Sequence, residues 1–421
     1  MDESVLDKLK ILAESAKYDV SCASSGTSRG HKAGAIGSAA GWGICHSFAE
    51  DGRCISLLKI MLTNYCRYDC AYCINRRSND IPRATLSVTE LVNLTIEFYR
   101  RNYIEGLFLS SGVVRNPDYT MERLVRIVKD LRTIHRFNGY IHLKGIPGAS
   151  PELIHEAGLY ADRMSVNIEI PNEKSLQTLA PEKDFQSVFT PMRHIQQGVL
   201  ESAEERKKYR SAPRFAPAGQ STQMIIGATP DSDKDILRLS SALYQRPTMK
   251  RVYYSGFVPV NAYDNRLPQL KQPPLVRENR LYQADWLLRF YQFKVDEIVD
   301  DSYPDLDLEI DPKLAWALRH PEKFPVDINR ADYELLLRIP GLGVKSAKMI
   351  IVSRRYGKIN GSQLKKMGVV LKKAQYFITC KELPLQMQTV NELSPQRVRS
   401  LLLPKPKKKV DERQLLLDFG E

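Results

Sequence analysis

The sequence is poor in cysteine and lacks long apolar runs. Seven cysteines in 421 residues are too few and too scattered for the dense paired framework of a small secreted domain. No run of eighteen or more apolar residues occurs, which argues against a membrane-spanning helix. The N-terminal residues have acidic side chains and a helical apolar spacing, without the basic head and apolar core of a signal peptide. We therefore expect a cytoplasmic protein with reduced thiols and no membrane partner.

The positive charge of the chain is concentrated in one segment. The whole sequence has a net charge of +13. Residues 331–410 contain 17 Lys and Arg against 4 Asp and Glu, so this segment carries the entire excess of positive charge. A neutral body joined to a strongly basic segment predicts a separate module that binds a polyanion.

Strand-like and helix-like stretches alternate between residues 55 and 300. Amphipathic helical stretches such as 87–102 and 120–137 separate six apolar runs of strand type. These runs are 54–63, 104–112, 139–148, 163–171, 221–230 and 251–260. Such alternation predicts βαβ units with a parallel sheet. The sequence therefore predicts an α/β fold with a partial six-unit barrel, whose active site lies at the carboxyl ends of the strands.

Four further segments flank this barrel region. Residues 1–54 combine an N-terminal helix with a Gly/Ser-rich stretch, which we interpret as a structural loop or lid. Residues 301–330 are acidic and then rich in proline, which indicates a connector. Residues 331–380 form the basic module, and residues 381–421 form a basic tail with a Pro/Lys stretch that we do not expect to fold alone.

Three of the cysteines lie close together, directly after the first predicted strand. Cys66, Cys70 and Cys73 have the spacing C-x-x-x-C-x-x-C, and Tyr72 precedes the last of them. Three thiols cannot all pair as disulfides, and a closed zinc site needs a fourth ligand. Candidates for that ligand are Cys45, His46 and Cys54. A cubane iron-sulfur cluster held by three cysteines would instead leave one iron open to a substrate or cofactor.

This cysteine segment resembles the signature of radical S-adenosylmethionine (SAM) enzymes, with an aromatic residue before the third cysteine and a strand before the loop. The resemblance implies that Cys66, Cys70 and Cys73 hold a 4Fe-4S cluster whose remaining iron binds SAM. It also implies reductive cleavage of SAM to a 5′-deoxyadenosyl radical, which abstracts hydrogen from the substrate. A zinc site, or a structural cluster completed by Cys45 or Cys54, stays open as an alternative.

The resemblance also assigns cofactor contacts at the strand ends. Tyr72 would lie beside the adenine of SAM. Ser110, Ser111 and Gly112 occupy the place of a segment that binds the SAM amino group, although the acidic residue common there is missing. The other candidates are Asn167 and Glu169 after the fourth strand and Ile226 and Gly227 on the fifth. Loop capping is the alternative role for each polar residue among them.

The basic module contains an internal repeat. Residues 337–350 align without gaps with residues 364–377, a period of 27 residues. The first copy resembles a helix-hairpin-helix motif, which grips the DNA backbone without reading its sequence. The residues that the resemblance assigns to this grip are Gly341, Gly343, Val344, Lys345 and Lys348. Val370 replaces Gly343 in the second copy, and a structural hairpin with protein contacts is the alternative.

Other residues give weaker indications. Arg76, Arg77 and Arg214 lie near predicted strand ends and are candidate contacts for substrate phosphates, with a solvated surface role as the alternative. We expect His142 to be packed or hydrogen-bonded rather than catalytic. Cys22, Cys45 and Cys54 are otherwise interpreted as small buried side chains. The sequence indicates no role for Cys380 and no electron donor.

The C-terminal residues resemble the short peptides that bind the bacterial sliding clamp, with Gln414, Leu417 and Phe419 as contacts. A tail that docks on its own protein is the alternative. Over nearly its whole length, the chain resembles a family of radical SAM proteins described as DNA modification or repair enzymes, often associated with a uracil-DNA-glycosylase-like partner. The resemblance predicts a radical SAM enzyme acting on DNA. RNA or a DNA-bound protein as substrate, and a non-catalytic DNA-binding scaffold, remain as alternatives.

Overall fold

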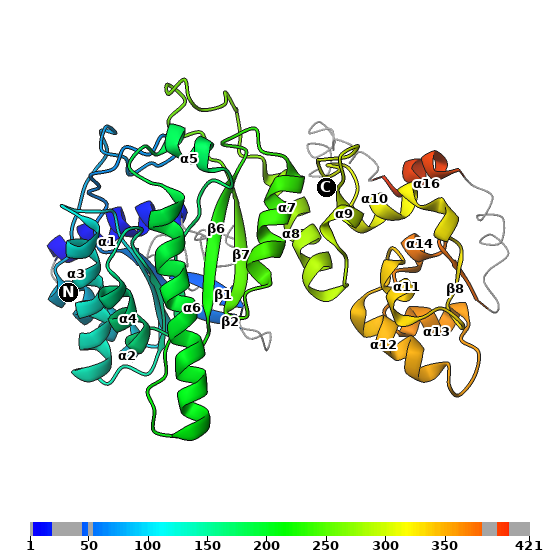
Figure 1. The fold of residues 1–421 in the computed structure, drawn as a ribbon, viewed down its shortest axis with the longest axis horizontal. Coiled ribbons are helices and arrows are strands. Elements are labelled where there is room, and N and C mark those ends of the chain that lie inside the picture. The colour runs from blue at the N-terminus through cyan, green and yellow to red at the C-terminus, as the bar shows by residue number, and fades with distance from the viewer. Residues whose placement is uncertain (1–2, 19–43, 49–53, 381–393, 404–421) are drawn as a thin grey trace, which may run out of the picture. The chain divides into compact units, whose positions relative to one another are not determined.

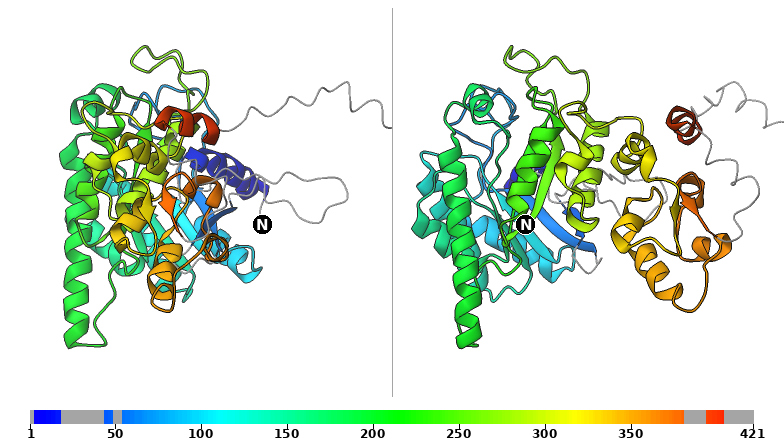
Figure 2. Two further views of the ribbon diagram at one scale, coloured as in Figure 1. Left: turned by 90° about the vertical axis from the view of Figure 1, so that its right-hand side faces the viewer. Right: turned by 45° about the vertical axis from the view of Figure 1, so that its right-hand side comes forward.

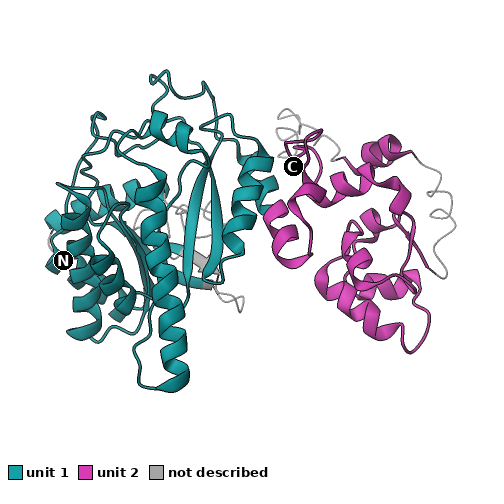
Figure 3. Cartoon of the chain, viewed as in Figure 1, with its two compact units in different colours: residues 1–282 teal, residues 283–421 magenta. Residues whose placement is uncertain are grey.

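The chain divides into two units, residues 1–282 and 283–421 (Figure 3). The computed structural model describes residues 3–18, 44–48, 54–380 and 394–403. The boundary between the units falls within helix α8 (Leu275–Phe290). The segment 301–330, expected to be a connector, therefore lies inside the second unit.

The first unit is built on a curved seven-stranded sheet in the order β1-β2-β3-β4-β5-β6-β7 (Figures 1 and 2). Strand β1 (Ile44–Phe48) runs antiparallel to β2 (Cys54–Met61), and every later pair is parallel. The other strands are β3 (Gly106–Ser110), β4 (Tyr140–Lys144), β5 (Arg163–Ser165), β6 (Gln220–Ile226) and β7 (Met249–Gly256). Six parallel strands in chain order confirm the predicted α/β partial barrel, and β1 adds a strand where a loop was expected.

Helices connect the parallel strands, and all but the short helix of residues 173–179 pack on the outside of the sheet (Figure 1). They are α2 (Val88–Arg100), α3 (Pro117–Thr133), α4 (Pro151–Tyr160), α5 (Glu173–Leu179), α6 (Phe185–Lys208) and α7 (Asp233–Tyr244). Local sequence sets where they begin, because Ser87 and Asp184 form capping boxes at the first turns of α2 and α6. Among the described helices, none has the length and apolar character needed to cross a membrane.

The N-terminal helix packs against the first parallel strand. Helix α1 (Glu3–Ser15) and the short 3-10 turn η1 (Ala16–Tyr18) both contact β2. The Lys59 ammonium donates to the carbonyl of Lys17 over 3.3 Å, and the Asn64 amide donates to the Ser15 hydroxyl over 3.1 Å. These bonds bring the end of the N-terminal helix to the carboxyl ends of the strands, where the candidate site lies.

The internal repeat of the second unit folds as two helical hairpins. The first joins α11 (Tyr333–Arg338) to α12 (Val344–Ser353), and the second joins α13 (Gly361–Lys366) to α14 (Leu371–Ala374). Gly341 and Gly368 occupy equivalent places in the repeat and both have φ near +80°. That left-handed conformation favours glycine and reverses the chain between the helices. The Val370 N–H donates to the Gly341 carbonyl over 2.8 Å and joins the hairpins.

The segment before the hairpins forms their scaffold. Its described elements are α9 (Val295–Ile298), α10 (Pro312–Arg319) and η2 (Pro321–Lys323), and β8 (Val326–Asp327) pairs in parallel with β9 (Ile378–Thr379). Helix α16 (Pro395–Leu402) contacts α10. The buried Lys313 ammonium donates to the Leu342 carbonyl over 2.6 Å, and Asp311 pairs with Lys373 at 2.7 Å. The first turn of α10 therefore holds both hairpins.

Candidate functional site

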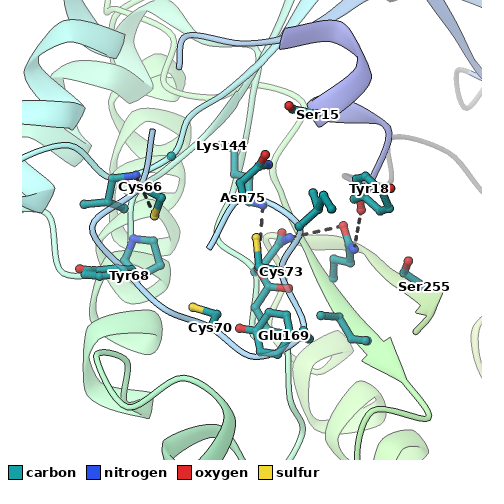
Figure 4. Close-up of a pocket in the computed structure, with 18 of the residues that line it drawn as sticks. Ser15, Tyr18, Cys66, Tyr68, Cys70, Cys73, Asn75, Lys144, Glu169 and Ser255 are labelled. Atoms are coloured by element: carbon teal, nitrogen blue, oxygen red, sulfur yellow. Dashed lines mark hydrogen bonds and ion pairs between the residues drawn. The ribbon is translucent and has the colours of Figure 1, made fainter. Parts of the chain in front are cut away.

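The three clustered cysteines line one pocket at the carboxyl ends of the parallel strands. Cys66, Cys70 and Cys73 come from the loop between β2 and α2, called here the cysteine loop (residues 62–86). The later strand ends contribute Ser111, Lys144, Glu169, Ile225 and Ser255. Figure 4 shows Ser15 and Tyr18 of the N-terminal helix across the pocket from Cys66. The cysteine loop and the strand ends therefore line one pocket, with the N-terminal helix as an additional wall.

A backbone N–H group points at one of the thiols. The Val113 N–H donates to the Cys66 Sγ over 3.4 Å. Burial, together with the neighbouring Cys70 and Cys66, raises the pKa of Cys73 to about 12. Burial also raises the pKa of Cys70. The Cys70 and Cys73 thiols therefore resist losing their protons unless a positive group binds them.

A buried network fixes the cysteine loop against the loop that follows β7. The Arg76 guanidinium is 5% exposed and pairs with Asp69 at 2.8 Å and with Asp264 at 2.7 Å. Hydrogen bonds from Arg266 and Arg76 hold the pKa of Asp264 well below its usual range. Arg76 was a candidate phosphate contact, but its burial and double ion pair make it a structural residue instead. Arg77 and Arg214 are exposed.

Asn261 belongs to the same network. Its side chain is fully buried, and its amide donates to the carbonyls of Ala71 over 2.7 Å and Cys73 over 3.0 Å. Its carbonyl accepts from the Asn79 amide over 2.8 Å. The sequence offers no signal for this residue, because nearly the whole barrel separates it from the cysteines along the chain.

The end of β3 lies directly against the cysteine loop. The Gly112 N–H donates to the Thr63 carbonyl over 2.8 Å, and a Cβ on Gly112 would collide with the Tyr65 carbonyl. Ser111 and Gly112 line the pocket, and the Ser111 hydroxyl donates to the Gly112 carbonyl over 2.7 Å. The Ser110 side chain is buried outside the pocket lining. A close approach of two backbones therefore accounts for Gly112.

Of the four other strand-end candidates, two reach the pocket. Asn167 and Glu169 line it, whereas Ile226 and Gly227 lie outside the lining, to which Ile225 contributes. Glu169 has φ +65°, a left-handed conformation that is uncommon for a residue with a side chain. Its carboxylate lies 3.9 Å from the Lys144 ammonium. A strained residue that presents a charge to a pocket is typical of functional sites.

Two charged or aromatic groups near the cysteines were not anticipated from the sequence. The Lys183 ammonium lines the pocket and lies 3.5 Å from the hydroxyl of Tyr72. Burial raises the pKa of Tyr72, so its hydroxyl is neutral at physiological pH. Tyr18 is the last described residue of the N-terminal segment and also lines the pocket. His142, by contrast, is packed as expected, with its Nε2 2.9 Å from the Ser165 hydroxyl.

Residues 60–209 match the family model of the radical SAM superfamily. The chain carries a radical SAM domain. A search of curated proteins found no match. Members of the radical SAM superfamily use a 4Fe-4S cluster and SAM.

Two solved structures are similar to parts of this chain at low sequence identity. One is the FeFe-hydrogenase maturase HydG from Carboxydothermus hydrogenoformans, with 14% identity, a TM-score of 0.42, and coverage of 54% of this chain and 50% of HydG. Another is a radical SAM methyltransferase from Sphaerobacter thermophilus, with 14% identity, a TM-score of 0.38, and coverage of 56% and 68%. The matched region therefore spans about half of HydG.

The residues of the radical SAM domain fit a 4Fe-4S cluster. Each thiolate of a cubane binds a different iron, so the sulfurs need not converge on one point. In the described part of the chain, no three His, Cys, Asp or Glu side chains are placed to hold a single metal ion. A bound cluster would supply the positive charge that stabilises the thiolates. Cys45 lies on β1 and does not line the pocket, and the Cys54 side chain and Cys22 lie outside what the structure describes.

In the second unit, the hairpin residues separate into turn residues and exposed residues. Gly341 forms the turn and Gly343 precedes the first residue of α12. Lys345 and Lys348 are exposed and form no ion pair within the described residues. The predicted clamp contacts Gln414, Leu417 and Phe419 lie outside the described residues.

Proposed function

We propose that this chain is a radical SAM enzyme that modifies or repairs DNA. In this proposal Cys66, Cys70 and Cys73 hold the 4Fe-4S cluster, and the pocket around them holds SAM. The observation that carries the proposal is the position of these three cysteines on one pocket at the strand ends of a radical SAM domain. The basic hairpin unit (residues 331–380) then binds the DNA backbone without reading sequence.

The bound cofactors would supply a 5′-deoxyadenosyl radical by reductive cleavage of SAM. The protein's own residues hold and shield the reactants. Lys183 offers a cation to anionic groups in the pocket, and Glu169 offers an acceptor to cationic or N–H groups. Apolar walls such as Ile146 and Phe257 exclude water from the site. A base in duplex DNA would have to leave the stack to reach this pocket.

The charge of the hairpin unit supports DNA as the partner. Residues 331–380 contain 10 Lys and Arg against 2 Asp and Glu. Within the described ranges, seven of these cations are exposed and form no ion pair. They are Lys345, Lys348, Arg355, Lys358, Lys365, Lys366 and Lys372. Unpaired surface cations at this density attract a polyanion and release its counterions on binding.

The cluster part of the proposal is tested by anaerobic reconstitution. The wild-type protein should bind about four irons per chain, show an iron-sulfur EPR signal after reduction, and form 5′-deoxyadenosine with SAM. Cys70→Ala should lose the signal and the product. Cys45→Ala is the matched control and should retain both, whereas a cluster completed by Cys45 would lose iron in that variant. A reduced cluster that forms no 5′-deoxyadenosine would favour a structural scaffold.

The substrate part is tested by nucleoside mass spectrometry after turnover with DNA, RNA and protein in separate reactions. DNA should give an altered nucleoside together with 5′-deoxyadenosine. If an altered product forms only with RNA or only with protein, that molecule replaces DNA as the proposed substrate. DNA affinity should also fall with salt, with a log-log slope of about −0.9 for each phosphate contact. Affinity that does not change with salt would refute backbone binding by the hairpin unit.

Further partners are proposed on the sequence alone. The chain would act with a uracil-DNA-glycosylase-like protein, and its tail would bind the sliding clamp through Gln414, Leu417 and Phe419. Co-elution with purified clamp should be lost on Phe419→Ala. Clamp binding that survives removal of the tail would refute this contact.

A further inference from the structure

One face of α12 is exposed along its whole length and carries cations and apolar side chains together. Met349 is 37% exposed, Val352 is 53% exposed, and Tyr356, in the turn that follows the helix, is 89% exposed. Lys345 and Lys348 are exposed on the same helix. At 100° per residue Lys345, Lys348, Met349 and Val352 fall within one third of the helix circumference, and Tyr356 follows in the turn after the helix. We call this set the α12 face.

The opposite side of α12 faces the interior of the second unit. Ser346, Ala347 and Ile350 are buried, and the Ser346 hydroxyl donates to the Met367 carbonyl over 2.8 Å. A ligand of α12 is therefore offered the exposed side chains of its other face.

The composition of the α12 face selects among ligands. Its lysines, together with Arg355 and Lys358 around Tyr356, are exposed and free of ion pairs within the described residues, which indicates a polyanion. Phosphates do not account for Met349, Val352 and Tyr356. In a nucleic acid, the apolar surfaces that match them are base faces, and base faces are available only where bases are unpaired.

We propose that Tyr356 stacks on an unpaired base while the lysines of α12 hold the adjacent phosphates. This inference rests on the proposed function, and it specifies the substrate class as DNA with single-stranded or unstacked bases. The helical part of the α12 face, from Lys345 to Val352, is about 10 Å long at the helical rise, and Tyr356 follows it in the next turn. A length of about 10 Å corresponds to about three nucleotides of one strand at the duplex rise. One strand therefore reaches both ends of the α12 face.

The test compares Tyr356→Ala with Tyr356→Phe, using the full chain and fluorescein-labelled oligonucleotides. Tyr356→Ala should weaken binding to a single strand by about 5- to 150-fold and change duplex affinity less than twofold. Tyr356→Phe keeps the ring and should bind like wild type. A 2-aminopurine base in the single strand should be quenched by the wild type and by Tyr356→Phe, but not by Tyr356→Ala. Because Tyr356 is exposed, the melting temperature should not change.

Two controls separate this inference from the proposed function. Tyr209→Ala removes a ring that is 68% exposed in the first unit and should not alter binding. Lys345→Glu with Lys348→Glu should weaken binding to single strands and duplexes alike. If the double lysine variant weakens binding but Tyr356→Ala has no effect, stacking is refuted and backbone binding stands. The same conclusion follows if Tyr356→Ala weakens binding to single strands and to duplexes equally. If the wild type binds no DNA, the DNA part of the proposed function is refuted as well.

Discussion

Replacing Asn261 by alanine tests whether the loop after β7 holds the cysteine loop in position. The Asn261 amide donates to two backbone carbonyls of the cysteine loop, at 2.7 Å for Ala71 and 3.0 Å for Cys73. Its carbonyl accepts from Asn79 at 2.8 Å. Alanine would remove all three hydrogen bonds at a fully buried position.

The expected cost follows from the groups left without partners. A buried polar group that loses its only partner costs about 1–3 kcal/mol. The Ala71 carbonyl would lose its partner in a fully buried residue, whereas the Cys73 carbonyl keeps the Arg76 N–H at 3.3 Å and the Asn79 amide keeps the Ile74 carbonyl at 2.8 Å. Because the three bonds share one side chain, their costs do not simply add. We expect Asn261→Ala to lower the free energy of unfolding by about 1–3 kcal/mol, against the 5–15 kcal/mol typical of a domain.

The assay combines urea unfolding of the metal-free protein with iron content after anaerobic reconstitution. Asn261→Ala should shift the unfolding midpoint downward and bind less iron per chain. Asn261→Asp keeps the size of the side chain but replaces the donor by an acceptor, so it should be at least as damaging. Asn93, exposed on α2, supplies the control, and Asn93→Ala should change neither quantity. Wild-type unfolding and iron content in Asn261→Ala would refute the reasoning.

Three further predictions concern the pocket and the buried network that fixes the cysteine loop. Gly112→Ala should displace the cysteine loop and lower iron content, with circular dichroism unchanged; full iron retention would contradict the close approach of the backbones. Lys183→Met should weaken SAM binding, measured by equilibrium dialysis, by about 10- to 150-fold, as expected for the loss of one charged hydrogen bond. Lys174→Met, on the exposed side of α5, is the control and should not weaken SAM binding. The Arg266 partner lowers the pKa of Asp264, so this carboxylate stabilises the fold at neutral pH and its contribution is lost as pH falls below about 4. The Asp264→Asn variant should therefore be less stable than the wild type at pH 7, and its free energy of unfolding should change less with pH in the acid range. An acid transition equal to that of the wild type would contradict the ion pair.

Local sequence patterns were sufficient to predict the framework of the first unit. The six parallel strands follow from apolar runs bounded by loops, and the helices begin at capping residues such as Ser87 and Asp184. Strand β1 was missed because a Gly/Ser-rich neighbourhood favours loop, and its pairing with β2 is a tertiary choice. The segment 301–330 was expected to be a connector because its composition is acidic and rich in proline. That composition does not show that Lys313 and Asp311 bond to the hairpins, which lie further along the chain.

The sequence by itself determined the spacing of Cys66, Cys70 and Cys73, because three ligands on one short loop depend only on local order. It also determined the hairpin turns, because glycine alone adopts their left-handed conformation without strain. Only the tertiary structure decided which distant groups meet the cysteines. Asn261 and Lys183 reach the cysteine loop through packing of the barrel, and no local pattern encodes contacts between segments so far apart in the chain.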